Sequence, residues 1–156
     1  MPSSVRRRAR PWRVLTSPIH GRGVFAARAI RKGETIIEYR GRRTTWDEAS
    51  EAAGDDDDPY HTFLFSLDDE RVIDAGVRGN AARFINHSCA PNCETYENDE
   101  GRVYITARRR IAPGEELSYD YRLEVDGKIG PRMRRAYACH CGAPRCRGTM
   151  LRSRPR

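Results

Sequence analysis

The sequence lacks any long hydrophobic run, and lysine is almost absent from it. No apolar stretch approaches the ~20 residues of a membrane-spanning helix, and no apolar segment follows the basic stretch Arg6–Arg10 as it would in a secretory signal. We therefore expect neither a membrane anchor nor secretion, and an intracellular protein. Lysine occurs only at Lys32 and Lys128, so almost all of the positive charge is arginine, which suits bidentate contacts with phosphate or carboxylate.

Length and composition favour one loop-rich globular domain. The 156 residues leave little room for a second domain, and 38% hydrophobic residues with a mean hydropathy of -0.80 are low for a globular chain. The formal net charge of +7 fits a nucleic-acid partner, an acidic surface or merely solvated basic segments, and charge alone does not choose between them. The arginine clusters are Arg6–Arg10, Arg108–Arg110, Arg132–Arg135 and Arg152–Arg156.

Short apolar runs separated by glycine, proline and other turn residues predict a mainly β protein with short helices. The expected strands are Gly23–Ala26, Thr35–Tyr39, Thr62–Leu67, Val72–Asp74, Val103–Ala107 and Glu116–Tyr119. Helices are expected at Thr45–Ala53, with Thr44 or Thr45 as N-cap, and at Asn80–Ile85. We expect Asp55–Asp58 to form an exposed acidic loop after the first helix.

Three of the five cysteines have a spacing typical of a zinc site. Cys139, Cys141 and Cys146 form a C-x-C-x4-C pattern in a tight segment that contains glycine and proline. Structural zinc takes four tetrahedral ligands, so a fourth must come from elsewhere. Cys89 and Cys93 are the main candidates, and His140 is a third. Disulfides are the rival interpretation, but an odd number of thiols and the expected intracellular location favour zinc.

Five motifs, taken together, resemble the SET-domain lysine methyltransferases, most closely the trithorax or mixed-lineage-leukaemia type. They occur in family order and extend from about Trp12 to Leu151. The motifs are Ile19-His20-Gly21-Arg22-Gly23-Val24-Phe25, Glu38-Tyr39-Arg40-Gly41, Gly79-Asn80-Ala81-Ala82-Arg83-Phe84-Ile85-Asn86-His87-Ser88-Cys89, Gly114-Glu115-Glu116-Leu117-Ser118-Tyr119-Asp120-Tyr121 and the cysteine segment that the family calls post-SET.

The resemblance implies a fold of small curved β-sheets with a C-terminal pseudoknot, in which the segments of Asn86 and Tyr121 pass through one another. Such threading is rare, and composition alone would not predict it. The implied segments are a basic flexible N-terminal arm (1–11), a SET domain (12–123), a linker (124–134), a post-SET zinc-binding segment (135–151) and a basic tail (152–156).

The implied activity is transfer of a methyl group from S-adenosylmethionine to a protein lysine. The residues matching the family's cofactor-binding positions are His20, Gly21, Arg22, Gly23, Phe63, Asn86, His87 and His140. Glycine there agrees with a ligand that lies close to the backbone. For His87, the resemblance implies contact with the adenine through backbone groups.

Aromatic residues are implied to form the catalytic centre and a narrow channel for the substrate lysine. Tyr121, Tyr119 and Tyr39 match catalytic positions, and the channel positions are Tyr39, Phe63, Phe65, Tyr119 and Tyr121. Tyr119 occupies the family's Phe/Tyr switch, where a hydroxyl leaves less room for a methylated amine, so mainly mono-methyl product is expected. At Phe63 the nearest relatives carry tyrosine, and this departure puts turnover rate and channel shape in question.

The zinc ligands implied by the resemblance are Cys89, Cys139, Cys141 and Cys146, with Cys93 left out. The expected partners are a histone tail or another basic lysine-bearing protein, and a weak nucleic-acid or nucleosome contact through the Arg-rich ends, in the cytoplasm or at nuclear chromatin. The first alternative is a catalytically silent SET module that binds a lysine-containing peptide or chromatin. The second is a small zinc-bearing nucleic-acid binder, although no predicted helix carries a row of base-reading side chains.

Overall fold

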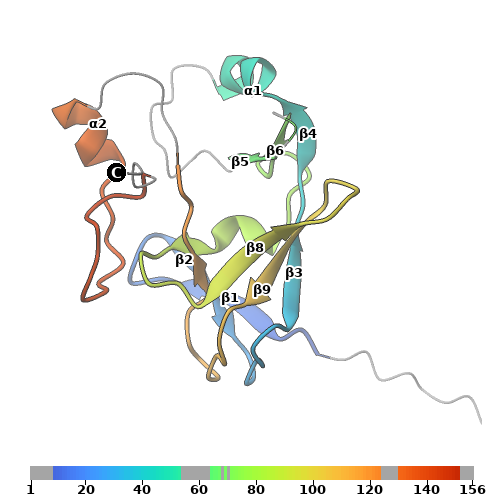
Figure 1. Ribbon diagram of the computed structural model, residues 1–156, viewed down its shortest axis with the longest axis vertical. Coiled ribbons are helices and arrows are strands. Elements are labelled where there is room, and N and C mark those ends of the chain that lie inside the picture. The colour runs from blue at the N-terminus through green and yellow to red at the C-terminus, as the bar shows by residue number, and fades with distance from the viewer. Residues whose placement is uncertain (1–8, 54–63, 68, 70, 124–129, 152–156) are drawn as a thin grey trace, which may run out of the picture.

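The computed structural model describes residues 9–53, 64–67, 69, 71–123 and 130–151, and it consists of short strands with few helices (Figure 1). The predicted fold class is confirmed. The strands are β1 (Trp12–Thr16), β2 (Arg22–Ala26), β3 (Thr35–Tyr39), β4 (Arg42–Thr45), β5 (Leu64–Ser66), β6 (Arg71–Asp74), β7 (Asn86–His87), β8 (Cys93–Glu97), β9 (Val103–Ala107) and β10 (Ser118–Tyr119). The helical segments are α1 (Trp46–Ala53), the 3₁₀ helix η1 (Ala81–Phe84) and α2 (Pro131–Ala136).

The strands in the described part of the chain form four small sheets. Two are antiparallel and three-stranded, with the orders β3-β9-β8 and β4-β6-β5, and β1 pairs antiparallel with β2. The fourth sheet is the parallel pair β7–β10. In Figure 1, α1 lies beside β4 and β6 at the top, and α2 lies at the upper left. Neither α-helix in the described part of the chain is long and apolar enough to span a membrane.

The core forms where apolar side chains alternate along the central strands. In β9, Val103, Ile105 and Ala107 are fully buried while the residues between them are half-buried, which is the period-two pattern of a strand. The largest fully buried side chains are Ile30, Ile73, Ile85, Ile105, Ile111, Leu117, Val24, Val72, Val103 and Cys93. This core holds the sheets in place around the shared site described below.

The predicted strands agree best with the observed strands where buried and exposed residues alternate strongly. β3 and β9 have the predicted bounds, and β2 and β6 each begin one residue earlier than predicted. β5 covers Leu64–Ser66 of the predicted Thr62–Leu67, of which residues 62–63 lie outside the described residues. The predicted strand Glu116–Tyr119 is shorter, because only Ser118–Tyr119 pairs as β10 while Glu116 forms an isolated bridge with Phe25.

Both predicted helices exist, with local differences. In α1 the Thr45 hydroxyl oxygen accepts a bond from the Glu48 amide at 3.3 Å, so Thr45 is the N-cap. The second helix is the 3₁₀ segment η1, which begins after Asn80 and ends when Ile85 turns to an extended conformation. That turn leads directly into β7. The acidic loop expected at residues 55–58 lies outside the described residues.

No element was predicted from the sequence at the positions of β1, β4, β7, β8 and α2. β4 and β8 are mostly exposed and polar, so their residues show no apolar alternation. α2 spans the predicted boundary between the linker and the post-SET segment. The division of the chain into those segments stays a prediction.

The parallel pairing of β7 with β10 brings two distant parts of the sequence together. Ser118 lies opposite Asn86 and Tyr119 opposite His87, and the Ser88 amide donates to the Tyr119 carbonyl at 3.2 Å. Just before β10, the Leu117 amide donates to the Val24 carbonyl of β2 at 2.7 Å. The chain around β10 therefore lies between β2 and β7, the close approach that a pseudoknot requires.

The C-terminal segment folds back on itself and contacts the end of the SET-like core. The Met150 amide donates to the Tyr137 carbonyl at 2.9 Å, and Leu151 forms a parallel bridge with Leu123. The Met150 and Leu151 side chains are buried. This contact holds the three C-terminal cysteines close to Cys89.

Candidate active site

Four aromatic rings from distant parts of the chain lie in one row. Tyr39 ends β3, Phe65 is in β5, Tyr119 is in β10, and Tyr121 follows two residues later. The ring centroids are 5.1 Å apart for Tyr39–Phe65, 6.4 Å for Phe65–Tyr119 and 4.9 Å for Tyr119–Tyr121. The structure thus brings together every described residue that was predicted to line the channel, while Phe63 lies outside the described residues.

Two phenol groups of this row, those of Tyr39 and Tyr119, are buried. Tyr39 and Tyr119 are 5% and 7% exposed. Burial raises the pKa of both hydroxyls, and the nearby Asp74 carboxylate adds to the shift in the pKa of Tyr39. Tyr39 and Tyr119 are therefore uncharged over the whole physiological pH range, and they form the buried part of the row, while Phe65 and Tyr121 are half-buried.

Tyr121 is fixed at both its side chain and its backbone. Its hydroxyl donates a hydrogen bond to the Ile85 carbonyl, and its amide donates to Nδ1 of His87 at 3.0 Å. The His87 and Tyr121 rings also meet edge to face, with centroids 5.3 Å apart. One contact comes from Ile85, at the turn after η1, and the others come from His87 in β7, so the position of Tyr121 depends on this segment.

Asn86 connects the His20–Gly23 loop to this centre. Its side-chain amide donates to the carbonyls of His20 at 3.2 Å and Arg22 at 3.1 Å, and to the Glu116 carboxylate at 3.2 Å. Asn86 itself is buried in β7. The predicted cofactor-binding loop and the Asn86-His87 pair are therefore neighbours, as the resemblance implied.

The two glycines of this loop have different surroundings. Gly21 has a positive φ of 46°, which favours glycine, and an added Cβ would meet open space. At Gly23 an added Cβ would overlap the Glu116 carboxylate of the chain itself. A larger residue at position 23 would therefore have to displace the Glu116 carboxylate, which also accepts a hydrogen bond from Asn86.

His87 is buried beside the centre in a neutral form. Burial lowers its pKa to about 4, although the Asp120 carboxylate, 3.6 Å from Nδ1, acts in the opposite direction. Asp120 pairs instead with Arg147 of the C-terminal segment. Burial disfavours the Asp120 charge, but hydrogen bonds from Arg147 and from the Arg122 amide still lower the pKa of Asp120.

Four thiols form a compact cluster: Cys89, Cys139, Cys141 and Cys146. Their sulfur atoms all lie within 4.8 Å of one another, with 3.7 Å between Cys89 and Cys139 and 3.9 Å between Cys89 and Cys146. A tetrahedron of Zn–S bonds of about 2.3 Å places sulfurs about 3.8 Å apart, whereas a disulfide needs about 2.05 Å. The donor set and its spacing therefore fit a structural zinc ion, and they are the set that the resemblance implied.

Local hydrogen bonds favour negatively charged sulfur in this cluster. The amides of Cys141, Gly148 and Arg147 lie 3.4, 3.3 and 3.4 Å from the sulfurs of Cys139, Cys146 and Cys89. Burial raises the pKa of the Cys89 and Cys139 thiols, so a cation is needed to stabilise both as thiolates.

The remaining candidates lie apart from the cluster or at its surface. Cys93 is buried elsewhere, its sulfur donates to the Asn92 side-chain oxygen at 3.3 Å, and burial raises the pKa of its thiol to about 12. His140 is exposed between Cys139 and Cys141. It was predicted to contact the cofactor, and that role stays a prediction.

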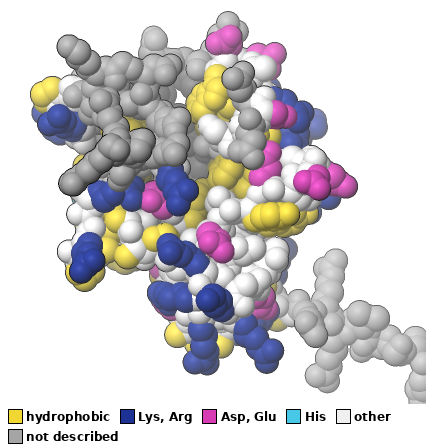
Figure 2. All heavy atoms as spheres, viewed as in Figure 1, with side chains coloured by type: hydrophobic (Ala, Val, Ile, Leu, Met, Phe, Trp, Pro, Cys, Tyr) yellow, Lys and Arg dark blue, Asp and Glu magenta, His cyan; other side chains and the backbone are white. Residues whose placement is uncertain are grey.

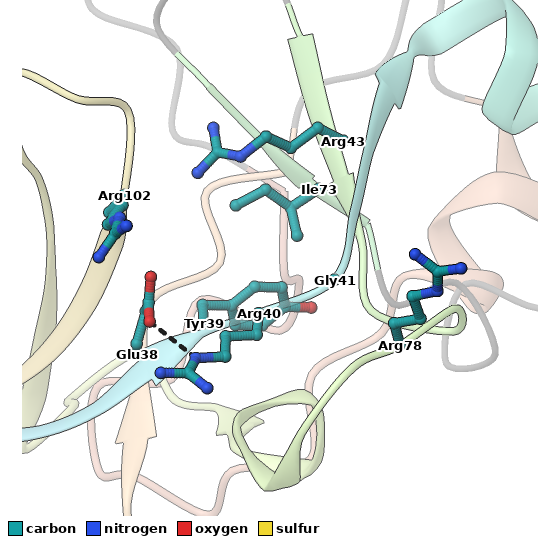
Figure 3. A pocket seen from close by; sticks show the side chains of 8 residues that line it. All are labelled: Glu38, Tyr39, Arg40, Gly41, Arg43, Ile73, Arg78 and Arg102. Atoms are coloured by element: carbon teal, nitrogen blue, oxygen red, sulfur yellow. Dashed lines mark hydrogen bonds and ion pairs between the residues drawn. The ribbon is translucent and has the colours of Figure 1, made fainter.

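An open hollow of about 350 Å³ lies beside Tyr39 and carries positive charge (Figure 3). Its lining residues are Glu38, Tyr39, Arg40, Gly41, Arg43, Ile73, Arg78 and Arg102. Glu38 is paired with Arg40 at 2.7 Å. Four arginines around one paired carboxylate would repel a basic peptide, so we do not assign this hollow to a lysine substrate.

Comparison with known proteins agrees with this geometry. The profile of the family described as SET domain matches residues 21–122. The chain belongs to the SET-domain family. The match includes the loop at Gly21, the aromatic row and Asn86, but it ends before Cys139, so the cluster of thiols stands on its own geometry.

Several relatives of this SET domain carry histone methyltransferase names. Histone-lysine N-methyltransferase trithorax of Drosophila virilis is 42% identical over 139 residues, which cover 86% of this chain and 3% of that protein. Human histone-lysine N-methyltransferase 2B is 41% identical over 140 residues, covering 86% of this chain and 5% of that protein. Arabidopsis thaliana histone H3-lysine(4) N-trimethyltransferase ATX1 is 42% identical over 141 residues, covering 86% of this chain and 12% of that protein.

A similar solved structure is ctPRC2 in an autoinhibited conformation bound to S-adenosylmethionine. It has a TM-score of 0.66 and 33% sequence identity to this SET domain, and the match covers 72% of this chain and 15% of that chain. The chain thus spans only a small part of each of these proteins.

Sequence reasoning missed three residues that hold the site together. Glu116 accepts from Asn86, while Asp120 and Arg147 join the core to the C-terminal segment. Glu116 and Asp120 stand within the motif that ends at Tyr121, and Arg147 directly follows Cys146. Their positions were therefore visible, but nothing in the sequence pairs an aspartate with an arginine so far away.

Proposed function

We propose that this SET domain transfers methyl groups from S-adenosylmethionine to lysine side chains of a basic protein, with a histone as the first substrate to test. The observation that carries the proposal is the aromatic row beside the Asn86–His20 contact. The aromatic row therefore lies next to the His20–Gly23 loop, which matches cofactor-binding positions in the family. The names of the relatives and the bound ligand of the ctPRC2 structure support the same choice of substrate and cofactor.

In this proposal the loop at His20–Gly23 and the Asn86-His87 pair hold the cofactor, joined by His140 and Phe63 from the resemblance. When bound, S-adenosylmethionine supplies the methyl group and a positive sulfonium that disfavours a second cation nearby. The protein shapes this cofactor site in two ways. There is open space beside Gly21, and the Asn86 side-chain amide holds the loop by donating to the His20 and Arg22 carbonyls.

The aromatic row prepares the substrate amine on the other side. An ammonium has no lone pair, and removing its proton near pH 7 costs about 5 kcal/mol for an ordinary lysine pKa of about 10.4. Tyr39, Phe65 and Tyr119 exclude water from the amine, which lowers its pKa. A unit positive charge about 4 Å away contributes roughly 4 kcal/mol in the same direction at an effective dielectric of 20. No dedicated Asp or His base is required.

Tyr121 is proposed to position the substrate amine, and Tyr119 is proposed to limit the space around it. The Tyr121 hydroxyl, held on the Ile85 carbonyl at one end of the aromatic row, is proposed to orient the amine or the transferred methyl group. The Tyr119 hydroxyl occupies space that a methylated amine would need. We therefore propose mainly mono-methyl product, although one relative is named a trimethyltransferase.

The four-cysteine cluster is proposed to hold a structural zinc ion that fixes the C-terminal segment against the core.

With a histone substrate, the site of action would be chromatin. The proposed nucleic-acid contact depends on the Arg-rich ends, and residues 1–8 and 152–156 lie outside the described residues. On the face shown in Figure 2, Arg and Lys side chains gather at the lower end, which is compatible with an anionic partner there.

The decisive experiment measures cofactor binding and methyl transfer separately. Calorimetry of the zinc-loaded protein with S-adenosylmethionine should show binding, and labelled cofactor should transfer methyl groups to histones. Tyr121→Phe should bind cofactor but transfer at least tenfold more slowly. Cofactor binding without transfer to histones or to other lysine-rich proteins would favour the silent SET module, and no cofactor binding would overturn the proposal.

A further inference from the structure

The imidazole of His87 touches both the cysteine cluster and Tyr121. The His87 side chain is only 2% exposed. Its Nδ1 accepts a hydrogen bond from the Tyr121 amide at 3.0 Å, and its Nε2 lies 3.5 Å from the sulfur of Cys89. One buried ring therefore lies between a proposed zinc ligand and the proposed catalytic tyrosine.

The geometry fixes which nitrogen of the ring carries the proton. A ring nitrogen that accepts an amide N–H has its lone pair in that bond, so a neutral imidazole must carry its hydrogen on the other nitrogen. For His87 this hydrogen is on Nε2, directed at the Cys89 sulfur. In many metal sites, a residue that does not itself bind the metal orients a metal ligand through a hydrogen bond. The N–H···S bond from His87 to Cys89 is of this kind.

We propose that the His87 side chain is a positioning group that couples the cysteine cluster to Tyr121, with Nδ1 holding the Tyr121 amide and Nε2–H holding the sulfur of Cys89. The inference rests on the proposed function for the roles of Cys89 and Tyr121. It adds a task for the imidazole to the backbone contact with adenine that the resemblance implies for this residue.

A second set of contacts closes a ring around His87. The Arg147 amide donates to the Cys89 sulfur at 3.4 Å, and its guanidinium donates to Asp120 at 2.7 and 3.1 Å. Asp120 directly precedes Tyr121, whose amide returns to His87. Because the contacts form a closed ring, a shift of Cys89 displaces the backbone of Tyr121 by two routes.

The coupling matters because methyl transfer is sensitive to position. A misplacement of about 1 Å at a reacting group can cost roughly a hundredfold in rate. Tyr121 is held by its hydroxyl, by its amide and by ring contacts with His87 and Tyr119, and His87 supplies both the amide bond and one of the ring contacts. Loss of order at the cysteines would therefore slow transfer even where the lysine channel is intact.

The first test reads the proton on the wild-type ring. Long-range ¹H–¹⁵N NMR of the zinc-loaded protein distinguishes the two neutral imidazole tautomers. We expect His87 to carry hydrogen on Nε2 alone. A hydrogen on Nδ1, or rapid exchange between the tautomers, would overturn the proposal, and this result does not depend on methyl transfer.

The second test uses two variants that each keep half of the ring's contacts. In His87→Asn the carboxamide oxygen replaces the Nδ1 acceptor, and in His87→Gln the carboxamide nitrogen replaces the Nε2 donor. Competition with a chromophoric chelator should show zinc affinity at least tenfold weaker in His87→Asn and nearly wild type in His87→Gln. With zinc in excess, kcat should fall at least tenfold further in His87→Gln than in His87→Asn.

Tyr96→Phe, on an exposed side chain of β8, is the control for both measurements. Equal losses in both variants, or no loss in either, would overturn the coupling. If neither variant folds, the NMR measurement of the His87 tautomer in the wild-type protein decides whether the proposal stands. A wild-type protein that binds zinc with the expected tautomer but transfers no methyl group would instead contradict the proposed function.

Discussion

Arg147 and Asp120 stand 27 positions apart in the chain, and their side chains form a two-point ion pair with distances of 2.7 and 3.1 Å. Arg147 also donates to the Leu151 carbonyl at 3.4 Å. The two side chains are partly shielded from solvent, with 26% and 19% of their surfaces exposed. The planar guanidinium matches the carboxylate, so this contact fixes both the distance and the angle of the C-terminal segment against the core.

Breaking this pair should loosen the C-terminal segment. Asp120→Asn removes the charge that Arg147 binds, at a cost of about 2 kcal/mol to the docking of residues 137–151. Hydrogen exchange should show faster exchange of the amides of Cys139 and Met150. Glu34→Gln weakens the more exposed Arg28–Glu34 pair, and it should cost less than about 1 kcal/mol and leave those amides protected. Equal effects of the two changes would contradict the docking role.

Metal removal should separate the four clustered cysteines from the fifth. Cys146→Ala should reduce bound zinc from one ion per chain to none, whereas Cys93→Ala should keep one ion, because Cys93 is buried away from the cluster. Elemental analysis of the purified variants measures this directly. Chelation of the wild-type protein should also weaken S-adenosylmethionine binding, and an unchanged affinity would defeat the predicted link between zinc and cofactor.

Two glycines differ sharply in the room around them. An added Cβ at Gly79 would overlap the Ala75 carbonyl, which is backbone and cannot rotate away, whereas one at Gly130 would meet open space. Gly79→Ala should therefore lower the free energy of unfolding by about 3 kcal/mol. Gly130→Ala should change it by less than about 1 kcal/mol. Chemical denaturation of both variants tests the difference, and a well-folded Gly79→Ala protein would show that the Ala75 turn is adaptable.

Removing one hydroxyl from the aromatic row should change the product. Tyr119 is buried between Phe65 and Tyr121, so Tyr119→Phe creates space at the amine without altering the ring contacts. Mass spectrometry of a lysine peptide should show mainly mono-methyl product for the wild-type protein and a shift to dimethyl or trimethyl product for the variant. Abundant trimethyl-lysine from the wild-type protein would contradict the assigned role of Tyr119.

Burial of the phenols makes stability fall at alkaline pH. The folded pKa values of Tyr39 and Tyr119 are raised by burial, so the folded state keeps their protons after the unfolded chain has begun to lose them near pH 10. This contribution to stability is complete below about pH 10 and is lost as the pH rises further. Urea unfolding between pH 8 and 11 should show the decrease, and Tyr39→Phe should make it shallower. A decrease as steep in the variant would assign the effect to other groups.

Sequence reasoning succeeded where a pattern has a local cause. β9 was predicted with its observed bounds because Val103, Ile105 and Ala107 alternate with polar residues and all three are buried. The cysteine spacing predicted three neighbouring thiols, and the resemblance supplied Cys89 as the fourth. The resemblance to SET-domain proteins placed Asn86 near the His20 loop, and Asn86 does contact that loop.

Other features have causes that lie outside the local sequence. β8 consists mostly of exposed polar residues, and it is a strand because β9 offers it backbone partners. Asp120 and Arg147 each look like ordinary surface charges until the fold places them together. For the same reason, no local pattern could show that the His87 ring lies between Cys89 and Tyr121.

β7 and β10 contain only two residues each, and among the described residues they pair only with one another in their sheet. A slip of one step would put Tyr119 opposite Asn86 and turn the side chains of the slipped strand to the opposite face. This short pairing joins the segment proposed to bind the cofactor to the segment proposed to bind the substrate amine, so a partial error in it would disturb both. We expect the protein to lose both binding sites together on heating or mutation, rather than survive as a binder of one substrate alone.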